Sequence, residues 1–154
     1  MNTKLRELHH SEFHAVCSWA ISEQWPGLIK GQLLSYDEFP QIIQLPNHFS
    51  FAMSEEACAA IGFGQIWLAP NGTSNLVRLL VDPAQRGQGY GKRLSALLLA
   101  EALRMPGCTQ VKLRVRRDNF PALAVYRSIG FRELEAESNQ HVLAMACAAD
   151  NGQI

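Results

Sequence analysis

The sequence predicts an α/β fold in which helices flank a mixed, mostly antiparallel central sheet. Two observations support this fold class. Short runs of alternating apolar and polar residues recur along the 154 residues, and between residues 49 and 81 only turn signals separate them. Later segments, residues 91–105 and 121–129, carry apolar residues at helical spacing and are each followed by a strand pattern. The predicted order of elements is β-α-α-β-β-β-α-β-α-β-β.

The first third of the chain predicts one strand and two helices. Residues 4–8 suit a short strand, and Ser11 suits the N-cap of a helix that ends at Trp25-Pro26-Gly27. The spacing of Ser35 and Glu38 matches a capping box, which predicts a second helix. We expect this helix to be short because Pro40 disfavours a long one.

The remaining elements follow from turn residues and apolar spacing. Residues 49–53 and 58–66 predict two strands, and the turn Pro70-Asn71-Gly72 precedes a third strand, Leu76–Val81, so the three form an antiparallel meander. A helix beginning near Gly91 ends at Pro106-Gly107, and a strand follows at Val111–Val115. Pro121 and Gly130 suit the start and the end of the last helix, before strands at residues 131–135 and 141–147.

Length and composition restrict the class of protein. We expect one domain over residues 1–147 and a loose tail over residues 148–154. Lys plus Arg and Asp plus Glu number 14 each, so no net charge indicates nucleic acid as a partner. No apolar run indicates a leader or a membrane span, and we expect a cytoplasmic protein. The four cysteines form no C-x-x-C pair, which predicts buried reduced thiols and no metal: Cys17, Cys58, Cys108 and Cys147.

A glycine-rich stretch between a strand and a helix, residues 86–91, predicts a phosphate site. Its sequence is Arg86-Gly87-Gln88-Gly89-Tyr90-Gly91. The first N–H groups of a helix have no internal partner, and the helix dipole makes that end positive. Glycine lets the backbone approach an anion closely. We therefore expect a phosphorylated ligand here, although a tight turn without a ligand is the alternative.

Three kinds of glycine loop must be distinguished. A dinucleotide fingerprint needs a third glycine where this chain has Lys92. A P-loop needs a glycine where this chain has Arg86 and a hydroxyl where it has Arg93. The pattern R-x-x-G-x-G is matched in full by Arg86, Gly89 and Gly91.

This loop, with a second block at residues 119–131, resembles two motifs of the GCN5-related N-acetyltransferase (GNAT) family. The second block is Asn119, then a helix with Ala122 and Tyr126, then Gly130-Phe131. The resemblance covers about residues 74–133. It implies an enzyme, monomer or homodimer, that moves an acetyl group from acetyl-CoA to a primary amine of a small molecule or a protein. A coenzyme A-binding sensor without catalysis and a dinucleotide-binding domain are the alternatives.

The resemblance also implies a set of site residues. The pantetheine arm would lie in a splayed gap between residues 76–81 and 111–115. A backbone N–H near Leu80 would stabilise the thioester oxyanion, and Tyr126 would protonate the departing thiolate. Lys92, Arg93, Arg116 and Arg117 are candidate counter-charges for phosphates. The residues expected to contact the cofactor are Leu79, Leu80, Val81, Arg86, Gly87, Gln88, Gly89, Tyr90, Gly91, Lys92, Asn119, Ala122 and Tyr126.

The general base and the acceptor stay open at this point. Many relatives carry a glutamate where this chain has Val77, and no carboxylate lies between Asn75 and Val81. Arg78 recognises an acidic group of the substrate or pairs with a carboxylate of the protein. Solvent is one candidate for the base; the others are Glu23, Asp37, His48, Glu55, Glu56 and His141. An apolar or aromatic-lined acceptor cleft is indicated by four aromatic residues: Trp19, Trp25, Tyr36 and Phe39.

Overall fold

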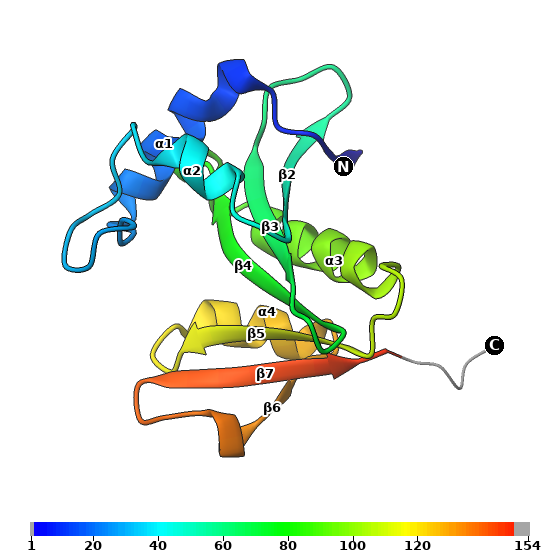
Figure 1. Ribbon diagram of the computed structural model, residues 1–154. Helices are drawn as coiled ribbons and strands as arrows, with labels where there is room; N and C mark the ends of the chain where they lie inside the picture. The colour runs from blue at the N-terminus through cyan, green and yellow to red at the C-terminus, as the bar shows by residue number, and fades with distance from the viewer. Residues whose placement is uncertain (1, 150–154) are drawn as a thin grey trace.

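The computed structural model describes residues 2–149 and contains one seven-stranded sheet in the order β1-β2-β3-β4-β5-β7-β6 (Figure 1). Every neighbouring pair is antiparallel except β4 and β5, which are parallel. The predicted mixed sheet and its order of elements are confirmed. The strands are β1 (Thr3–Arg6), β2 (His48–Glu55), β3 (Gly62–Leu68), β4 (Thr73–Val81), β5 (Gln110–Arg116), β6 (Arg132–Glu133) and β7 (Val142–Ala148).

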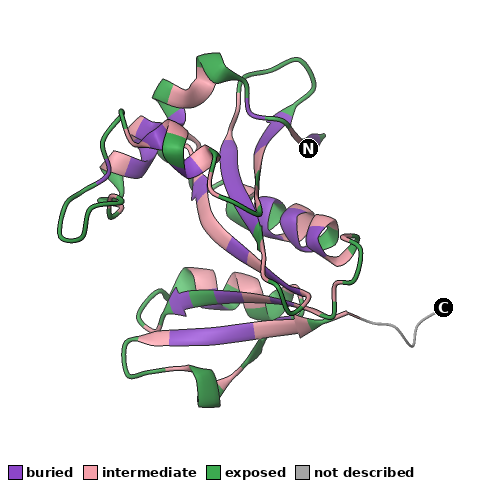
Figure 2. Ribbon diagram, viewed as in Figure 1, coloured by how far each residue is buried: buried purple, intermediate pink, exposed green. Residues whose placement is uncertain are grey.

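Helices cover both faces of the sheet. Ala52 of β2 packs in a hydrophobic cluster with α1 and α2, and its neighbour Met53 packs in a second hydrophobic cluster with α3. Because successive residues of a strand point to opposite faces, the two clusters lie on opposite sides of the sheet. Both clusters are buried where helix and sheet meet (Figure 2). The helices are α1 (Phe13–Ser22), α2 (Phe39–Ile43), α3 (Tyr90–Leu103) and α4 (Phe120–Ser128).

The two parallel strands separate after a short paired stretch. β4 and β5 pair only where residues 73–75 meet residues 110–112. The rest of β4 stays with β3, and the rest of β5 stays with β7. The sheet therefore opens in its middle, and Figure 1 shows the ends of the two strands diverging. The resemblance to the GNAT family implies a gap of this kind between residues 76–81 and 111–115.

A β-bulge interrupts the pairing of β3 with β4. Phe63 faces Leu80, but Gln65 faces Val77, so two residues of β4, Arg78 and Leu79, oppose the single residue Gly64. A Cβ at Gly64 would lie 2.5 Å from a methyl carbon of Leu98 on α3. A side chain at this position would therefore force Leu98 to shift, so glycine suits the close packing of α3 on the bulged part of the sheet.

Several boundaries differ from the prediction because distant contacts decide them. Ser11 lies inside the 3-10 turn His10–Glu12, and Glu12 is the N-cap residue of α1. Cys58 and Ala60 precede β3, because Glu12 accepts a hydrogen bond from the Ala60 N–H, 2.9 Å, and holds that loop apart. The contacts of Glu38 with Ser35 form, but α2 begins only after them, at Phe39.

The predicted tail and the predicted thiols are also corrected in part. Ala148 belongs to β7, because it pairs with Gln110 of β5, and residues 150–154 lie outside the described part of the chain. All four cysteines are free. Only Cys17 is buried, whereas Cys58 is exposed on the β2–β3 turn.

Candidate active site

The glycine loop forms an open cradle at the start of α3. Gly87 and Gly89 have φ values of 78° and 82°, which favour glycine, and Gly89 is the N-cap residue of α3. The Gly89 carbonyl accepts the first hydrogen bond of the helix, which the Arg93 N–H donates, 3.2 Å. The three preceding N–H groups have no helical acceptor. A Cβ at Gly87, Gly89 or Gly91 would meet no atom within 4 Å, so the backbone borders open space.

A cavity of about 630 Å³ joins this loop to β4 and α4. Of the residues predicted to contact a cofactor, all line it except Gln88 and Lys92. The Gln88 amide turns back to the side chain of Gln85, 3.3 Å, and Lys92 is exposed on α3. Sequence reasoning missed further lining residues next to the predicted ones along the chain or one helical turn away: Gln85, Leu94, Ser95, Pro121 and Val125.

The backbone of β4 presents alternate groups to the gap. The Asp82 N–H donates to the carbonyl of Ile61, 2.8 Å, so it points towards β3. In an antiparallel pair this direction alternates, so Leu80 also bonds towards β3. Val81, which lies between Leu80 and Asp82, then directs its N–H into the gap, and the bulge at Arg78 and Leu79 interrupts the alternation beyond Leu80. The oxyanion donor expected near Leu80 stays a prediction, and Leu79, which is adjacent to Leu80 and lines both cavities, is a candidate for it.

Asn119 and Tyr126 are positioned by α4. Asn119 is the N-cap residue, and its Oδ1 accepts a hydrogen bond from the Ala122 N–H, 3.3 Å. Tyr126 lies two turns further on, and its ring packs edge-on against Phe131 with centroids 5.9 Å apart. Burial raises the pKa of the Tyr126 phenol above its usual value of 10. The phenol therefore keeps its proton at neutral pH.

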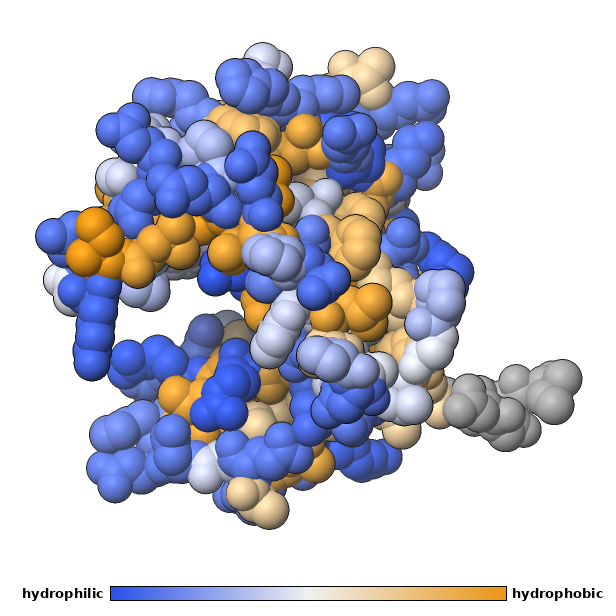
Figure 3. All heavy atoms as spheres, viewed as in Figure 1, coloured by the Kyte–Doolittle hydropathy of each residue, from blue (hydrophilic) through white to orange (hydrophobic). Residues whose placement is uncertain are grey.

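A second cavity, of about 410 Å³, meets the first at Tyr126. The two share four lining residues: Trp25, Leu79, Asn119 and Tyr126. Figure 3 shows an open hollow between the half of the molecule with α1 and α2 and the half with β5 and β7. Among the described residues, three arginines and no Asp or Glu line this second cavity: Arg78, Arg114 and Arg116.

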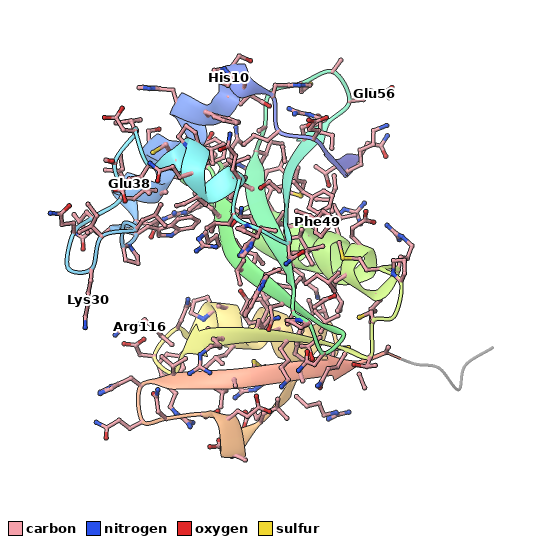
Figure 4. The ribbon with its side chains drawn as sticks, in the orientation of Figure 1. His10, Lys30, Glu38, Phe49, Glu56 and Arg116 are labelled. Carbon is pink, nitrogen blue, oxygen red and sulfur yellow. The ribbon has the colours of Figure 1, made fainter. Side chains whose placement is uncertain are left out.

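Only one candidate base borders either cavity. Glu23 lines the first cavity, where it forms an ion pair with Arg86 of the glycine loop. The other candidates, Asp37, His48, Glu55, Glu56 and His141, line neither cavity. Glu56, for example, lies on the outer β2–β3 turn (Figure 4).

Most of the cations expected to bind phosphates form contacts with other residues of the protein. Arg93 donates to the hydroxyl and the carbonyl of Thr3, 3.0 Å each. Arg116 pairs with Asp118, and Arg117 pairs with Glu135. None of these three lines the cavity at the glycine loop, where Arg86 is the lining cation.

The aromatic residues expected at an acceptor cleft divide into two groups. Trp19 and Phe39 are buried in the core, and Tyr36 stacks on His14 with centroids 4.6 Å apart. Of the four, only Trp25 lines the cavities. Trp67 of β3 lines the second cavity, and the sequence carried no signal for this because strand pairing places it there.

Residues 2–149 contain neither a membrane-spanning helix nor a cluster of metal-ligating side chains. No helix there is long and apolar enough to cross a membrane. No group of three or more His, Cys, Asp and Glu side chains gathers there as metal ligands would.

Comparison with known proteins gives a family and a fold. The model of the acetyltransferase (GNAT) family matches residues 5–131. A mycothiol acetyltransferase of Saccharopolyspora erythraea is 35% identical over 77 residues, and the N-alpha-acetyltransferase RimI of Mycobacterium tuberculosis is 48% identical over 54 residues. These alignments cover 50% and 35% of this chain. They span 25% and 32% of the two relatives.

Solved structures match over almost the whole chain. The spermidine N-acetyltransferase of Vibrio cholerae, in complex with CoA and spermine, superposes with a TM-score of 0.80. It is 16% identical, over 97% of this chain and 96% of that one. The ribosomal-protein-S18-alanine N-acetyltransferase of Escherichia coli superposes with a TM-score of 0.70 at 21% identity, over 96% and 94% of the two chains. At these identities the likeness concerns the fold.

Proposed function

Because this chain belongs to the acetyltransferase (GNAT) family, we propose that it transfers an acetyl group from acetyl-CoA to a primary amine. One observation carries the proposal. A single cavity brings together an anion cradle at a helix N-terminus, the open edge of β4 and a half-buried phenol, Tyr126. We also propose that residues 1–147 form one such domain.

The glycine loop suits the phosphates of coenzyme A. Its free N–H groups and the positive end of α3 attract an anion, and the absence of side chains at Gly87, Gly89 and Gly91 leaves room for it. Arg86 adds a cation at the same loop. When bound, acetyl-CoA supplies the activated thioester.

The open edge of β4 suits the pantetheine arm and the acetyl oxygen. Val81 offers backbone groups to an extended chain, as a neighbouring strand would. The Leu79 N–H is the donor we assign to the carbonyl oxygen, where negative charge develops as the amine attacks. The amine forms a new C–N bond, the C–S bond breaks, and Tyr126 donates its proton to the departing sulfur.

The proton of the amine leaves to water in this proposal. β4 offers no carboxylate beside the reaction site, and Glu23 is paired with Arg86. The second cavity opens to solvent beside Tyr126, so water reaches the amine.

Thermal shift and turnover together test this function. We expect CoA and acetyl-CoA to stabilise the protein, by ~2.7 kcal/mol at 100 times the dissociation constant, and NAD to give no shift. Release of free thiol from acetyl-CoA is then followed with a panel of primary amines. Stabilisation without turnover of any amine would indicate a coenzyme A-binding sensor. Absence of a shift would overturn both functions.

A further inference from the structure

Arg78 occupies an unusual backbone position beside the proposed reaction site. Its φ is 55°, in the left-handed region that non-glycine residues rarely adopt, and it lies in the β-bulge opposite Gly64. Bulges often re-aim a side chain near an active site. Leu79 packs on the α3 side of the sheet. Arg78 instead reaches Gln65 on the α1–α2 side, where the second cavity lies.

Gln65 holds the guanidinium of Arg78 in place without neutralising its charge. The buried Gln65 amide donates to the Ile42 carbonyl and to the Ser50 hydroxyl, 3.0 Å each. This leaves Oε1 of Gln65 to accept from Arg78, also at 3.0 Å. An arginine has five N–H donors, so Arg78 keeps a free edge for a further acceptor.

No carboxylate of residues 2–149 forms an ion pair with Arg78. The side chain is half-buried, and burial lowers the pKa of its guanidinium. A charge removed from water is costly unless an opposite charge or several hydrogen bonds compensate it. Of the two sequence-based roles for Arg78, pairing with a carboxylate of the protein is therefore not observed.

The other cations at this cavity have partners inside the protein. Arg116 pairs with Asp118 at 3.0 Å, and Arg114 donates to the Glu137 carbonyl at 3.3 Å. In the view of Figure 4, Lys30 extends from the loop between α1 and α2 towards the side that carries Arg116. With no lining carboxylate among the described residues, the cavity attracts anions and repels polycations.

We propose that the acceptor is a small-molecule amine that also carries a carboxylate, and that Arg78 binds this carboxylate. This inference rests on the proposed acetyl transfer. A planar guanidinium and a carboxylate form two parallel hydrogen bonds, which orient the acceptor. The amine would then lie where the two cavities meet, at Tyr126. The volume of about 410 Å³ suits a small molecule, and Trp25 and Trp67 offer it apolar walls.

The test compares acceptors with and without the carboxylate. We would measure kcat/KM for L-phenylalanine and L-leucine and for their amides, with wild type and Arg78→Gln. We expect Arg78→Gln to lower kcat/KM at least ~10-fold for the acids, since hydrogen bonds to charged groups are strong. For the amides we expect a change within ~2-fold, because a neutral carboxamide forms no ion pair with the guanidinium and its hydrogen bond is weaker. Since the amide alters the basicity of its own amine, the comparison uses the ratio of variant to wild type.

Two controls separate this effect from general damage. Arg104→Gln removes an exposed arginine of the α3 end and should leave all four rates unchanged. Arg78→Gln should keep the full thermal shift with CoA, because the glycine loop lies in the other cavity.

Inhibition of the wild-type protein is an independent test that needs no variant. In it, 3-phenylpropionate should compete with the acceptor, and 3-phenylpropionamide should not.

Each contrary result has a distinct meaning. Equal losses for acids and amides in Arg78→Gln, a preference for spermidine over the amino acids, or no inhibition by 3-phenylpropionate would overturn this inference and leave acetyl transfer standing. Absence of turnover with every amine would overturn the proposed function and, with it, this inference.

Discussion

Glu23, directly after the last residue of α1, forms an ion pair with Arg86 of the glycine loop. The pair joins two segments 63 positions apart in the sequence. Both side chains are substantially exposed, 36% and 50%, so the pair adds little to stability. It places the loop arginine at the rim of the cavity, where a phosphate would compete with Glu23 for it.

Arg86→Gln should weaken CoA binding at least ~10-fold, because it removes a charge-assisted contact to phosphate. Glu23→Gln should leave CoA affinity unchanged or raise it, since it removes the competing carboxylate. Isothermal titration with CoA measures both. A loss of affinity in Glu23→Gln as large as in Arg86→Gln would show that the pair itself, rather than Arg86, binds the ligand.

Gly89→Glu should abolish the thermal shift produced by CoA. The φ of 82° is strained for any side chain, and the added carboxylate would lie where phosphate is expected. Gly107→Glu is a matched control, because Gly107 also has a positive φ and open space around its Cβ position but lies far from α3's first turn. If Gly89→Glu kept the full shift, the loop would not be the CoA site.

Tyr126→Phe should lower kcat at least ~10²-fold, because general acid catalysis is typically worth 10²–10⁴-fold. The substitution keeps the ring that packs on Phe131, so the CoA thermal shift should change little. Steady-state kinetics with saturating acetyl-CoA measure the effect. A variant with near-normal kcat would leave Tyr126 in a packing role, with water as the proton donor.

The rate should rise with pH towards the pKa of the free acceptor amine. No unpaired carboxylate of the described residues borders the cavities, so the amine must lose its proton to water before it attacks. The raised pKa of Tyr126 keeps the acid protonated over the same range. A pH profile of kcat/KM from 6 to 10 tests this. An inflection near pH 6 to 7 that disappears in Glu23→Gln would identify Glu23 as the base.

Glu12→Gln should destabilise the fold at neutral pH and much less in acid. Hydrogen bonds from Arg6, and then from the Ala60 and His9 N–H groups, lower the Glu12 pKa from 4.5 to about 2. A lowered carboxyl pKa stabilises the fold above the unfolded value and loses that contribution as pH falls from about 4.5 to about 2. The upper limit is about 3 kcal/mol.

Urea unfolding at pH 7 and at pH 2.5 measures this contribution. The difference in unfolding free energy between wild type and Glu12→Gln should shrink at the lower pH. Glu56→Gln, on the exposed β2–β3 turn, serves as the control and should leave stability unchanged at both. If the difference in unfolding free energy were equal at both pH values, the loss would come from packing rather than from the charge of Glu12.

Local signals in the sequence determined the elements and most of the first cavity. Apolar periodicity and turn residues are properties of neighbouring positions, so they predicted the order of strands and helices. The glycine spacing of residues 86–91 and the cap at Asn119 likewise act within a few residues, because a helix end is completed by its own flanking backbone. Residues 79–81, Asn119, Ala122 and Tyr126 were expected at the site because two motifs of the sequence resemble those of the GNAT family, whereas the phosphate site at residues 86–91 follows from local glycine spacing.

Only the tertiary structure decided how the second cavity is built. The bulge that turns Arg78 to the α1–α2 side depends on the register between β3 and β4. The buried Gln65 that holds Arg78 is fixed by α2 and β2, and Trp67 reaches the cavity through the same strand pairing. Glu12, rather than Ser11, is the N-cap residue of α1, and its side chain binds Arg6 of β1 and the Ala60 N–H of the β2–β3 turn. Each of these contacts joins residues that the sequence keeps apart, and pairing energies between distant segments leave no periodic trace in either segment alone.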